Sequence, residues 1–535
     1  MQRWLALPFA LLPLQPAWFG GLAALVGLWA LLRGERPLLW KAFLAVGLLG
    51  ALGQLLTPAS IYSPPERPSF LGSPPKTTPP SNLIRPYDLK TLHGWNPKDF
   101  DGGQAKPVEQ GFWYLPRHNP ISGHEQTEFL TDWWYPLKAG QTYTQSFYLR
   151  HDGQRANLQI TFFTNQGHHP VPTQMEPAAP GVYRVWGSYT AKEGDGSLRA
   201  IDFLNQGGDF TYLEVGWPQL EIGSTPTPYQ LGPTGLKPLD WRLWWWIGTT
   251  LMGFLMVQAG VWIFQQISPT HAALAVLAGL LVHLGYAGWQ WLETGPGARV
   301  MGLTPQPNFL GHGAVMAAGL IWVLGGRRLG GIALGVAALL LWISGSRTAF
   351  WAWLLLGAAW GWSLGRRRWV ALGLAGLLGA VALFEPEWLG RFSQALSLDH
   401  NAQARLQFWQ VALQAFRENP LGGVGFGNFT PYFNLYSPKN TIEYSPPHAH
   451  NLLLNLLAEG GALALLGVGV WLAGIVRLIV RTRAWPVLIL LGVALVLNSF
   501  DFTFFSAWVY YPLLLAVAHA IAGAQDQPGS AKMRR

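Results

Sequence analysis

The sequence contains no cysteine and little charge. The absence of cysteine among its 535 residues excludes disulfides, thiolate nucleophiles and cysteine-ligated zinc. Charged residues make up only 12% of the chain, about half of the roughly 25% found in soluble domains, whereas 50% of the residues are hydrophobic. Apolar runs of roughly 20 residues recur, which is long enough to cross a bilayer core. The composition therefore predicts a polytopic α-helical membrane protein.

Two further features of the composition fit this class. A net charge of +9 can indicate nucleic-acid binding, but in a membrane protein it more often reflects basic cytoplasmic loops, so we expect no nucleic-acid partner. Many of the 29 tryptophans lie near the ends of apolar runs, as interfacial belts require. Arg3 precedes an apolar stretch like that of a signal sequence. No clear small-residue cleavage site follows, so we interpret this segment as a retained membrane anchor.

The apolar runs predict about eleven or twelve transmembrane helices. Pro8, Pro13 and Pro16 break the first two runs, which form either a tight helical hairpin or one long bent helix. The runs fall near residues 4–15, 17–33, 38–57, 242–264, 271–292, 307–325, 328–344, 347–364, 368–385, 452–478, 485–501 and 503–523.

Basic residues in the short loops predict the orientation, because Lys and Arg accumulate on the cytoplasmic side of membranes. Residues 58–240, the tip near 345–347 and the loop 386–451 are then expected to face outward. The basic sites are RGER (Arg33 to Arg36) with Lys41, GGRR (Gly325 to Arg328), GRRR (Gly365 to Arg368), RLIVRTR (Arg477 to Arg483) and the C-terminal KMRR.

The same pattern divides the chain into membrane and extracytoplasmic parts. The predicted domains are N-terminal transmembrane helices at 1–57, a proline-rich extracytoplasmic linker at 58–119, a β-sandwich at 120–235, transmembrane helices at 240–385, an extracytoplasmic loop at 386–451, C-terminal transmembrane helices at 452–523 and a cytoplasmic tail at 524–535.

The β-sandwich prediction rests on alternating patterns such as QTYTQSFYLR (Gln141 to Arg150), which are separated by Gly, Asn and Asp turns. The closing WPQLEIGSTPTPY (Trp217 to Tyr229) resembles carbohydrate-binding modules of the jelly-roll kind. Trp133, Trp134 and Trp186 are candidates to stack on sugar rings. The alternative is that these tryptophans fill the sandwich core or rest on the membrane, since large aromatic residues are usually buried for packing.

Two arginines stand out on the outer side of the membrane part. Arg347 lies alone at a helix tip in LWISGSRTAFWAW (Leu341 to Trp353), where it either reaches for lipid phosphates or provides a fixed guanidinium for a phosphate group. Arg405 lies near Trp409 on a predicted amphipathic helix capped by Asp399. Arg405 is either the solvated edge of that helix or a second phosphate ligand.

The outer loop ends in a glycine-rich turn and a histidine motif. The turn PLGGVGFGNF (Pro420 to Phe429) lacks the GxGxxG spacing and a preceding βαβ unit, so we reject a nucleotide site and expect a tight return of the chain. The motif SPPHAHNLLLNLLAEGG contains His448, His450 and Asn451. These histidines are either polar helix ends or, with Glu443 as the one close carboxylate, a weak metal site. Without a metal, His450 can take a proton from a hydroxyl near neutral pH.

These motifs occur in an order that resembles the O-antigen ligase and O-antigen polymerase superfamily, which includes bacterial protein O-oligosaccharyltransferases. The resemblance covers about residues 300 to 470, beginning at GLTPQPNFLGHGAVMA (Gly302 to Ala317). The family motif is His, then Asn/Ser/Gln, nine residues, Gly, two residues and Gly/Thr/Tyr. Here it reads His450, Asn451, Gly461 and Ala464, so the last position departs from the pattern.

The resemblance implies an inverting, metal-independent glycosyltransferase without a cofactor in the bacterial cytoplasmic membrane. The donor would be a glycan on a polyprenyl diphosphate, and the acceptor a hydroxyl of lipid A core, of another lipid-linked glycan or of a protein. His450 would be the catalytic base, Arg347 and Arg405 would bind the diphosphate, and Asn451 and His448 would support them. The loop 386–451 would then be catalytic, with membrane lipids around the polyprenyl tail.

Other functional classes remain open at this stage. Ligase and polymerase are not separated by the motifs. A transporter would place paired ionisable groups at mid-membrane, where His283 and His312 are the candidates, while Glu293 and Asp501 lie near span ends. A membrane-tethered carbohydrate sensor would use the β-sandwich but would leave the outer arginines and histidines unexplained.

Overall fold

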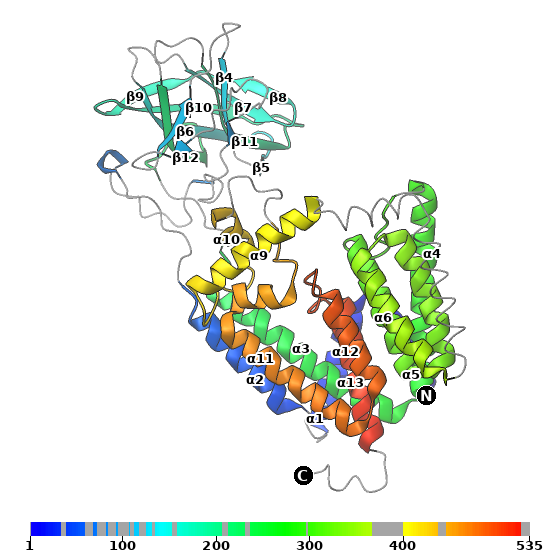
Figure 1. The fold of residues 1–535 in the computed structure, drawn as a ribbon. Coiled ribbons are helices and arrows are strands. Elements are labelled where there is room, and N and C mark those ends of the chain that lie inside the picture. Colours follow the sequence, from blue (N-terminus) through cyan, green and yellow to red (C-terminus); the bar gives the residue numbers. More distant parts are fainter. Residues whose placement is uncertain are drawn as a thin grey trace. The chain divides into compact units, whose positions relative to one another are not determined.

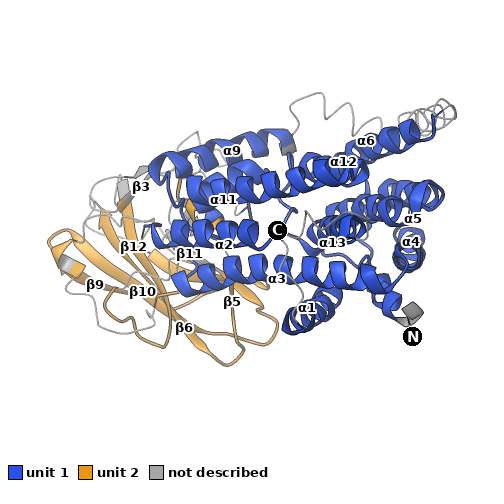
Figure 2. Ribbon diagram, turned by 90° about the horizontal axis from the view of Figure 1, so that it is seen from below, with its two compact units in different colours: residues 1–58, 237–429, 441–535 blue, residues 59–236, 430–440 orange. Residues whose placement is uncertain are grey.

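The computed structural model describes most of the membrane part and the cores of two β-sheets. The described residues are 2–33, 39–58, 68–71, 82–83, 93–94, 106–107, 112–116, 125–130, 134–151, 158–205, 212–229, 236–295, 298–365, 400–436 and 446–525. The chain forms two compact units (Figure 2), one of residues 1–58, 237–429 and 441–535 and one of residues 59–236 and 430–440.

The first unit is helical (Figure 1). Its described helices are η1 (Gln2–Leu11), α1 (Pro16–Leu32), α2 (Trp40–Leu55), α3 (Leu239–Gln266), α4 (Pro269–Thr294), α5 (Pro307–Ser344), α6 (Arg347–Ser363), α9 (His400–Glu418), α11 (Leu452–Thr482), α12 (Trp485–Leu497) and α13 (Ala507–Gln525). Five of these, α3, α4, α5, α11 and α13, are long and apolar enough to cross a membrane, and α1, α2 and α12 are shorter apolar helices. The prediction of a polytopic membrane protein is confirmed.

Helix α5 is two helices that meet at Gly326. This residue has φ +72°, a left-handed conformation that glycine adopts without strain. A Cβ on Gly330 would lie 2.8 Å from Cβ of Trp322, although eight positions in one straight helix would separate them by about 12 Å. The chain therefore folds back at the GGRR sequence, as the separate apolar runs 307–325 and 328–344 predicted.

The N-terminal segment differs from both predicted forms. The first run is a 3-10 helix, η1, followed after Pro13 by α1, rather than a helical hairpin or one bent helix. At about 2 Å per residue, η1 is too short to span a bilayer. It packs against α4 where Gly279 leaves room for the Ala10 carbonyl. The run 368–385 lies outside the described residues, so the total number of spans stays a prediction.

Small residues allow the helices of this unit to pack closely. Gly50 of α2 lies against the indole of Trp246 of α3, and a side chain at that glycine would collide with the ring. The indole Nε1 of Trp246 donates to the Val46 carbonyl at 3.0 Å. Gly27 of α1 faces the Leu255 carbonyl of α3 in the same way. Such contacts are typical of membrane bundles, where close backbone approach replaces the hydrophobic driving force.

The second unit contains two antiparallel sheets. One has the order β1-β4-β11-β7-β8 with β5 beside β11, and the other β2-β3-β12-β6-β10-β9. Its strands are β1 (His93–Gly94), β2 (Lys106–Pro107), β3 (Phe112–Pro116), β4 (Glu125–Leu130), β5 (Trp134–Pro136), β6 (Thr142–His151), β7 (Leu158–Thr164), β8 (Gly167–Pro170), β9 (Gln174–Ala179), β10 (Val182–Thr190), β11 (Ser197–Asn205) and β12 (Tyr212–Ile222).

The two sheets share one buried core. Ile160 and Leu198 come from one sheet, and Phe147, Val185 and Leu220 from the other, and all five are fully buried. This arrangement confirms an inserted β-sandwich, since each sheet covers one face of the other. Its strands begin at residue 93, and the predicted domain boundaries along the chain stay predictions.

Of the three tryptophans predicted to stack on sugar rings, the structure describes the side chain of Trp186. Trp186 of β10 is half-buried, and its Nε1 atom is buried without a hydrogen-bond partner among the described residues. Trp133 and the side chain of Trp134 lie outside the described residues. The closing motif packs internally, because Trp217 and Tyr229 form a buried edge-to-face pair with ring centroids 5.2 Å apart.

Candidate active site

Two loops at one end of the helical unit meet at the histidine motif. One loop leads into α11, and the other connects α12 to α13. Asn451 joins them, because its Oδ1 accepts the Leu454 N–H as the cap of α11 while its Nδ2 donates to the Ser499 carbonyl at 2.8 Å. The Leu452 N–H also donates to the Asn498 carbonyl at 2.9 Å. Asn451 is therefore a structural link between the loops as well as a helix cap.

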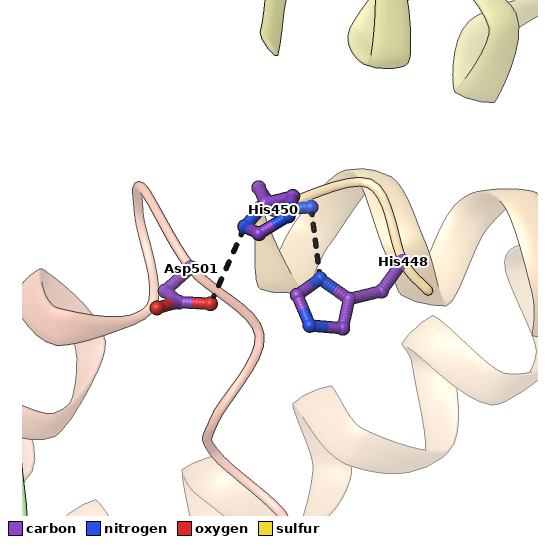
Figure 3. Close-up of side chains that lie close together, drawn as sticks. All are labelled: His448, His450 and Asp501. Carbon is purple, nitrogen blue, oxygen red and sulfur yellow. Dashed lines mark hydrogen bonds and ion pairs between the residues drawn. The ribbon is translucent and has the colours of Figure 1, made fainter. Parts of the chain in front are cut away.

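Within these loops, His450 faces the carboxylate of Asp501 (Figure 3). The Nδ1 atom of His450 lies 3.5 Å from Oδ1 of Asp501, which is within ion-pair distance but longer than a regular hydrogen bond. Asp501 is only 2% exposed, whereas His450 is 22% exposed and therefore accessible to a reactant. His450 also has φ +49°, a sparsely populated conformation for a residue with a side chain. Such residues gather at functional sites, where the surroundings hold them in place.

His448 lies directly beside His450. Its Nδ1 accepts the His450 backbone N–H at 3.3 Å, and the two rings meet edge to face with centroids 4.3 Å apart. Burial, reinforced by the charge of His450 and partly opposed by Asp501, lowers the pKa of His448 to about 4. His448 is therefore neutral near pH 7 and remains an acceptor for the strained backbone N–H of His450.

Asp501 is held by a chain of polar contacts from the starts of other helices. Asn308, in the first turn of α5, donates to Oδ2 of Asp501 at 3.3 Å. Arg299 donates from Nη2 to Oδ1 of Asn308 at 2.8 Å, and from Nε to the Ser344 carbonyl at 2.9 Å. The Asp501 carboxylate is thus oriented on one side by Asn308 and faces His450 on the other.

The charge state of Asp501 follows from these surroundings. Burial by itself raises the pKa of this carboxyl group, but its interactions with the imidazole of His450 at 3.5 Å and with His312 and His448 outweigh burial and hold the pKa below its usual range. His312 reaches the same loop, because its Nδ1 lies 2.9 Å from Oγ1 of Thr503. Asp501 is therefore a carboxylate at neutral pH, able to stabilise a protonated imidazole.

Helix α9 covers the two loops. The ring of Phe408 stacks on His450 with centroids 5.6 Å apart, and Trp409 lies against Phe500 at 6.4 Å. Arg405 is half-buried and precedes these two aromatic residues by one turn, so it shares their side of α9. The predicted helix carrying Arg405 and Trp409 is present as α9, and its predicted cap, Asp399, lies outside the described residues.

Arg347 begins α6, three residues after Ser344. The Ser344 carbonyl accepts a hydrogen bond from Arg299, which also binds Asn308 beside Asp501. The tip that carries Arg347 is therefore connected to the Asp501 loop through one arginine. The starts of α5, α6 and α11 all meet here, at the end of the unit opposite the GGRR turn.

The glycine-rich turn docks against a break in α11. Gly461 has φ +63°, and a side chain there would collide with the Leu421 carbonyl. Val424 and Gly425 donate to the carbonyls of Ala458 and Glu459 at 2.8 and 3.0 Å, so the turn satisfies acceptors that the break leaves free. The nine-residue spacing from Asn451 to Gly461 thus has a physical meaning. It sets the length of the short first piece of α11, Leu452–Gly460.

The cluster also has the composition of a metal site. His448, His450 and Asp501 each offer one ligand atom, and these atoms lie within 4.8 Å of one another. Two imidazoles and a carboxylate suit Zn²⁺, with ligand distances of about 2.0–2.2 Å. A metal bound here would occupy the His450 nitrogen that faces Asp501.

The sequence pattern misses three members of this site. It does not predict Asp501, Asn308 or Arg299 as site residues, and it indicates Asp501 only as an ionisable group near a span end. A usable signal exists, because Asp501 is an isolated acidic residue in an apolar region between two spans. Glu443, the carboxylate expected nearest to a metal site, lies outside the described residues. Among the described residues, Asp501 is a carboxylate beside the two histidines.

Comparison with known proteins agrees with the motif order. Residues 313–469 match the family model described as O-antigen ligase. The match begins in the first half of α5 and extends through α6, α9, the glycine-rich turn and the histidine loop into α11. A search of curated proteins finds no match.

Proposed function

Because residues 313–469 match the family model described as O-antigen ligase, we propose that this chain is an inverting, metal-independent glycosyltransferase. It moves a glycan from a polyprenyl diphosphate, such as undecaprenyl diphosphate, to an acceptor hydroxyl. The observation that carries this proposal is the accessible His450 imidazole backed by the buried Asp501 carboxylate at 3.5 Å. A histidine oriented by a carboxylate is a suitable general base near neutral pH.

The chemical step requires a base on the acceptor side. His450 removes the proton from the acceptor hydroxyl through Nε2, since Nδ1 faces Asp501. The deprotonated acceptor oxygen attacks the anomeric carbon from the face opposite the diphosphate. The bond from that carbon to the diphosphate oxygen breaks, so a single displacement inverts the anomeric centre. Asp501 stabilises the imidazolium that forms, while His448 and Asn451 support the loop.

The leaving group needs positive charge, because the diphosphate gains negative charge as the glycosidic bond breaks. Arg347 and Arg405 provide guanidinium groups from α6 and α9. Helix α9 packs on the histidine loop through Phe408, and the residues just before α6 are linked to Asp501 through Arg299 and Asn308. Guanidinium binds phosphate oxygens in pairs and remains charged at all relevant pH values. Fixed charges of this kind stabilise the transition state without a metal ion.

The site is proposed to lie on the periplasmic side of the bacterial cytoplasmic membrane. The support is the positive-inside pattern together with the convergence of the starts of α5, α6 and α11 away from the basic GGRR turn. There a membrane-held donor meets a hydroxyl that arrives through water. The β-sandwich is proposed to bind the glycan of the acceptor or product, with Trp186 as one contact.

Among the members of the superfamily, we propose ligase-like block transfer, with polysaccharide polymerase or protein O-oligosaccharyltransferase as alternatives. A lipid or glycan transporter is less well supported, because the ionisable groups gather at helix ends rather than at mid-membrane. Purified protein reconstituted with a polyprenyl diphosphate glycan and separate lipid, glycan and peptide acceptors tests these options. Single additions indicate a ligase, growing chains a polymerase, labelled peptide an oligosaccharyltransferase, and movement across the bilayer without covalent product a transporter.

A further inference from the structure

A buried carboxylate lies behind the histidine loop and belongs to neither proposed catalytic role. Glu459 is 4% exposed and lies near the end of the short first piece of α11, two residues before the break at Gly461. A carboxylate so deeply buried must be hydrogen-bonded to persist. Glu459 is therefore tied to its surroundings through specific donors.

Both carboxylate oxygens of Glu459 accept hydrogen bonds from elements of the site. Oε1 accepts the Phe429 N–H at 2.9 Å, which fixes the end of the glycine-rich turn. Oε2 accepts the Asn455 side-chain N–H at 2.9 Å. The backbone carbonyl of Glu459 accepts from Gly425 at 3.0 Å and from Nε2 of Gln54 at 3.3 Å. One residue thus holds the turn, the short helix and the end of α2 together.

Asn455 passes this restraint to the histidine loop. It is 1% exposed, and its Oδ1 accepts the backbone N–H of Ala449 at 2.9 Å. Ala449 lies between His448 and His450 and is itself fully buried. The donor and acceptor roles in this hydrogen-bond chain are fixed, because the Asn455 side chain donates to Glu459 and accepts from the Ala449 N–H.

The other end of the same chain leads to α9. The glycine-rich turn follows α9 directly, and the Gly423 N–H donates to the Asn419 carbonyl at 2.8 Å, just after the helix end. Helix α9 carries Arg405, and Phe408 on the same helix stacks on His450. Glu459 is thus bonded both to the loop of the base and to the turn that ends the arginine-bearing helix.

We propose that Glu459 is a positioning residue that sets His450 in its left-handed backbone conformation and in register with α9, acting through Asn455 and Ala449. This inference rests on the proposed glycosyl transfer only for its effect on rate. The positioning itself is a property of the hydrogen-bond chain. A conformation as unfavourable as φ +49° for a histidine persists only when its neighbours fix it.

The donor and acceptor roles in this hydrogen-bond chain can be tested with two single variants and their combination. In Glu459→Gln, two donors, Phe429 N–H and the Asn455 amide, face a side chain with only one acceptor. If the Asn455 amide turns over, its NH₂ group then faces the Ala449 N–H. In Asn455→Asp, two carboxylates lie within hydrogen-bonding distance of each other. Glu459→Gln leaves one mismatched pair whichever way the Asn455 amide points, and Asn455→Asp leaves one mismatched pair between two carboxylates.

The double variant restores the hydrogen bonds from the Ala449 and Phe429 N–H groups and the one between positions 455 and 459, with the negative charge moved from position 459 to position 455. When Asn455→Asp is combined with Glu459→Gln, the new carboxylate at position 455 accepts from the Ala449 N–H and from the new amide at position 459. The carbonyl oxygen of that amide accepts from the Phe429 N–H. The number of atoms and the total charge are unchanged. Recovery in the double variant therefore reports hydrogen-bond polarity rather than volume.

The experiment measures two quantities on full-length protein in nanodiscs. The first is amide hydrogen exchange of the peptide spanning 446–452, and the second is kcat and KM for a polyprenyl diphosphate glycan. We expect at least tenfold faster exchange and at least tenfold lower kcat, with KM within about threefold, in both single variants, and recovery to within about threefold in the double variant. Gln258→Glu, a buried amide-to-carboxylate change in α3, is the control. It lowers thermal stability but leaves exchange of 446–452 and kcat of the folded fraction unchanged.

Three results overturn the proposal. The first is wild-type exchange and kcat in Glu459→Gln, the second is a double variant as impaired as the single ones, and the third is faster exchange with unchanged kcat. If wild-type protein transfers no glycan, the proposed function fails while hydrogen exchange still decides the positioning role. In the third case, Glu459 orders the loop without serving the base.

Discussion

The buried carboxylate of Asp501 lies 3.5 Å from the Nδ1 atom of His450, although 50 intervening residues separate the two in the chain. The two loops that carry them are joined by Asn451, which caps α11 and binds the Ser499 carbonyl. In the proposed mechanism this pair forms the base side of the site. The carboxylate gives a histidine placed just before a membrane helix a partner suited to proton transfer, beyond any role in capping.

The Asp501–His450 pair predicts the effect of removing one charge. Asp501→Asn keeps the shape of the side chain but no longer stabilises the imidazolium, so we expect kcat to fall about 10²-fold with little change in KM. Steady-state transfer with purified protein measures this. The matched control is His271→Ala, at the start of α4 near the opposite end of the unit, which is expected to retain wild-type kcat. Equal activity in Asp501→Asn and wild type would show that the carboxylate has no role in the step.

Acidification is predicted to destabilise the protein through His448. Its pKa in the folded protein is about 4, below the value near 6.5 of an unfolded chain, so the unfolded state binds more protons between these values. Stability therefore falls as the pH drops from about 6.5 to about 4. The lowered pKa of Asp501 acts in the same direction at still lower pH. Thermal unfolding across this range should show a shallower slope in His448→Asn than in wild type. Identical slopes would contradict the assignment.

The sequence predicted the class of fold well because its signals were local. Apolar run length predicted the membrane part, and alternation in Gln141 to Arg150 predicted β-sandwich strands. The outer placement of the histidine loop, which the charge of the short loops predicts, stays a prediction. The proline-broken N-terminus was less predictable, because helix and 3-10 helix share the same apolar pattern there.

The partners of His450 were hidden for a different reason. Asn308 and Asp501 lie far from His450 in the sequence, and only tertiary packing brings them to the histidine loop. A single sequence shows each as one isolated polar residue beside an apolar run. The role of Gly461 was also indirect, since its left-handed φ matters only because the Leu421 carbonyl lies where a side chain would be.

The two outer arginines are predicted to act through geometry as well as charge. Replacing Arg347 and Arg405 with Lys keeps the charge but removes the planar fork, so we expect turnover to fall at least tenfold, with the double variant lowest. Transfer rates at saturating acceptor, with and without added Mg²⁺, measure this. Arg417→Lys, an exposed position at the end of α9, serves as the control. Normal turnover in both Lys variants would refute the diphosphate role.

Metal ions are predicted to inhibit rather than to assist. Chelation with EDTA should leave the transfer rate unchanged, because the arginines supply the charge at the leaving group. Micromolar Zn²⁺ should inhibit by binding His448, His450 and Asp501, whose ligand atoms lie within 4.8 Å of one another. His448→Ala should shift the inhibition to higher Zn²⁺ concentration. A loss of activity on chelation that Zn²⁺ restores would reverse this assignment and make the cluster a catalytic metal site.

The most direct test of the account is glycan transfer by His450→Ala protein in proteoliposomes, with a polyprenyl diphosphate donor of defined anomeric configuration. Wild type is expected to give a product of inverted configuration. His450→Ala is expected to fold, as judged by thermal unfolding, and to lose transfer by at least about 10²-fold. Transfer at the wild-type rate by His450→Ala, or retention of configuration in the wild-type product, would contradict the central claim.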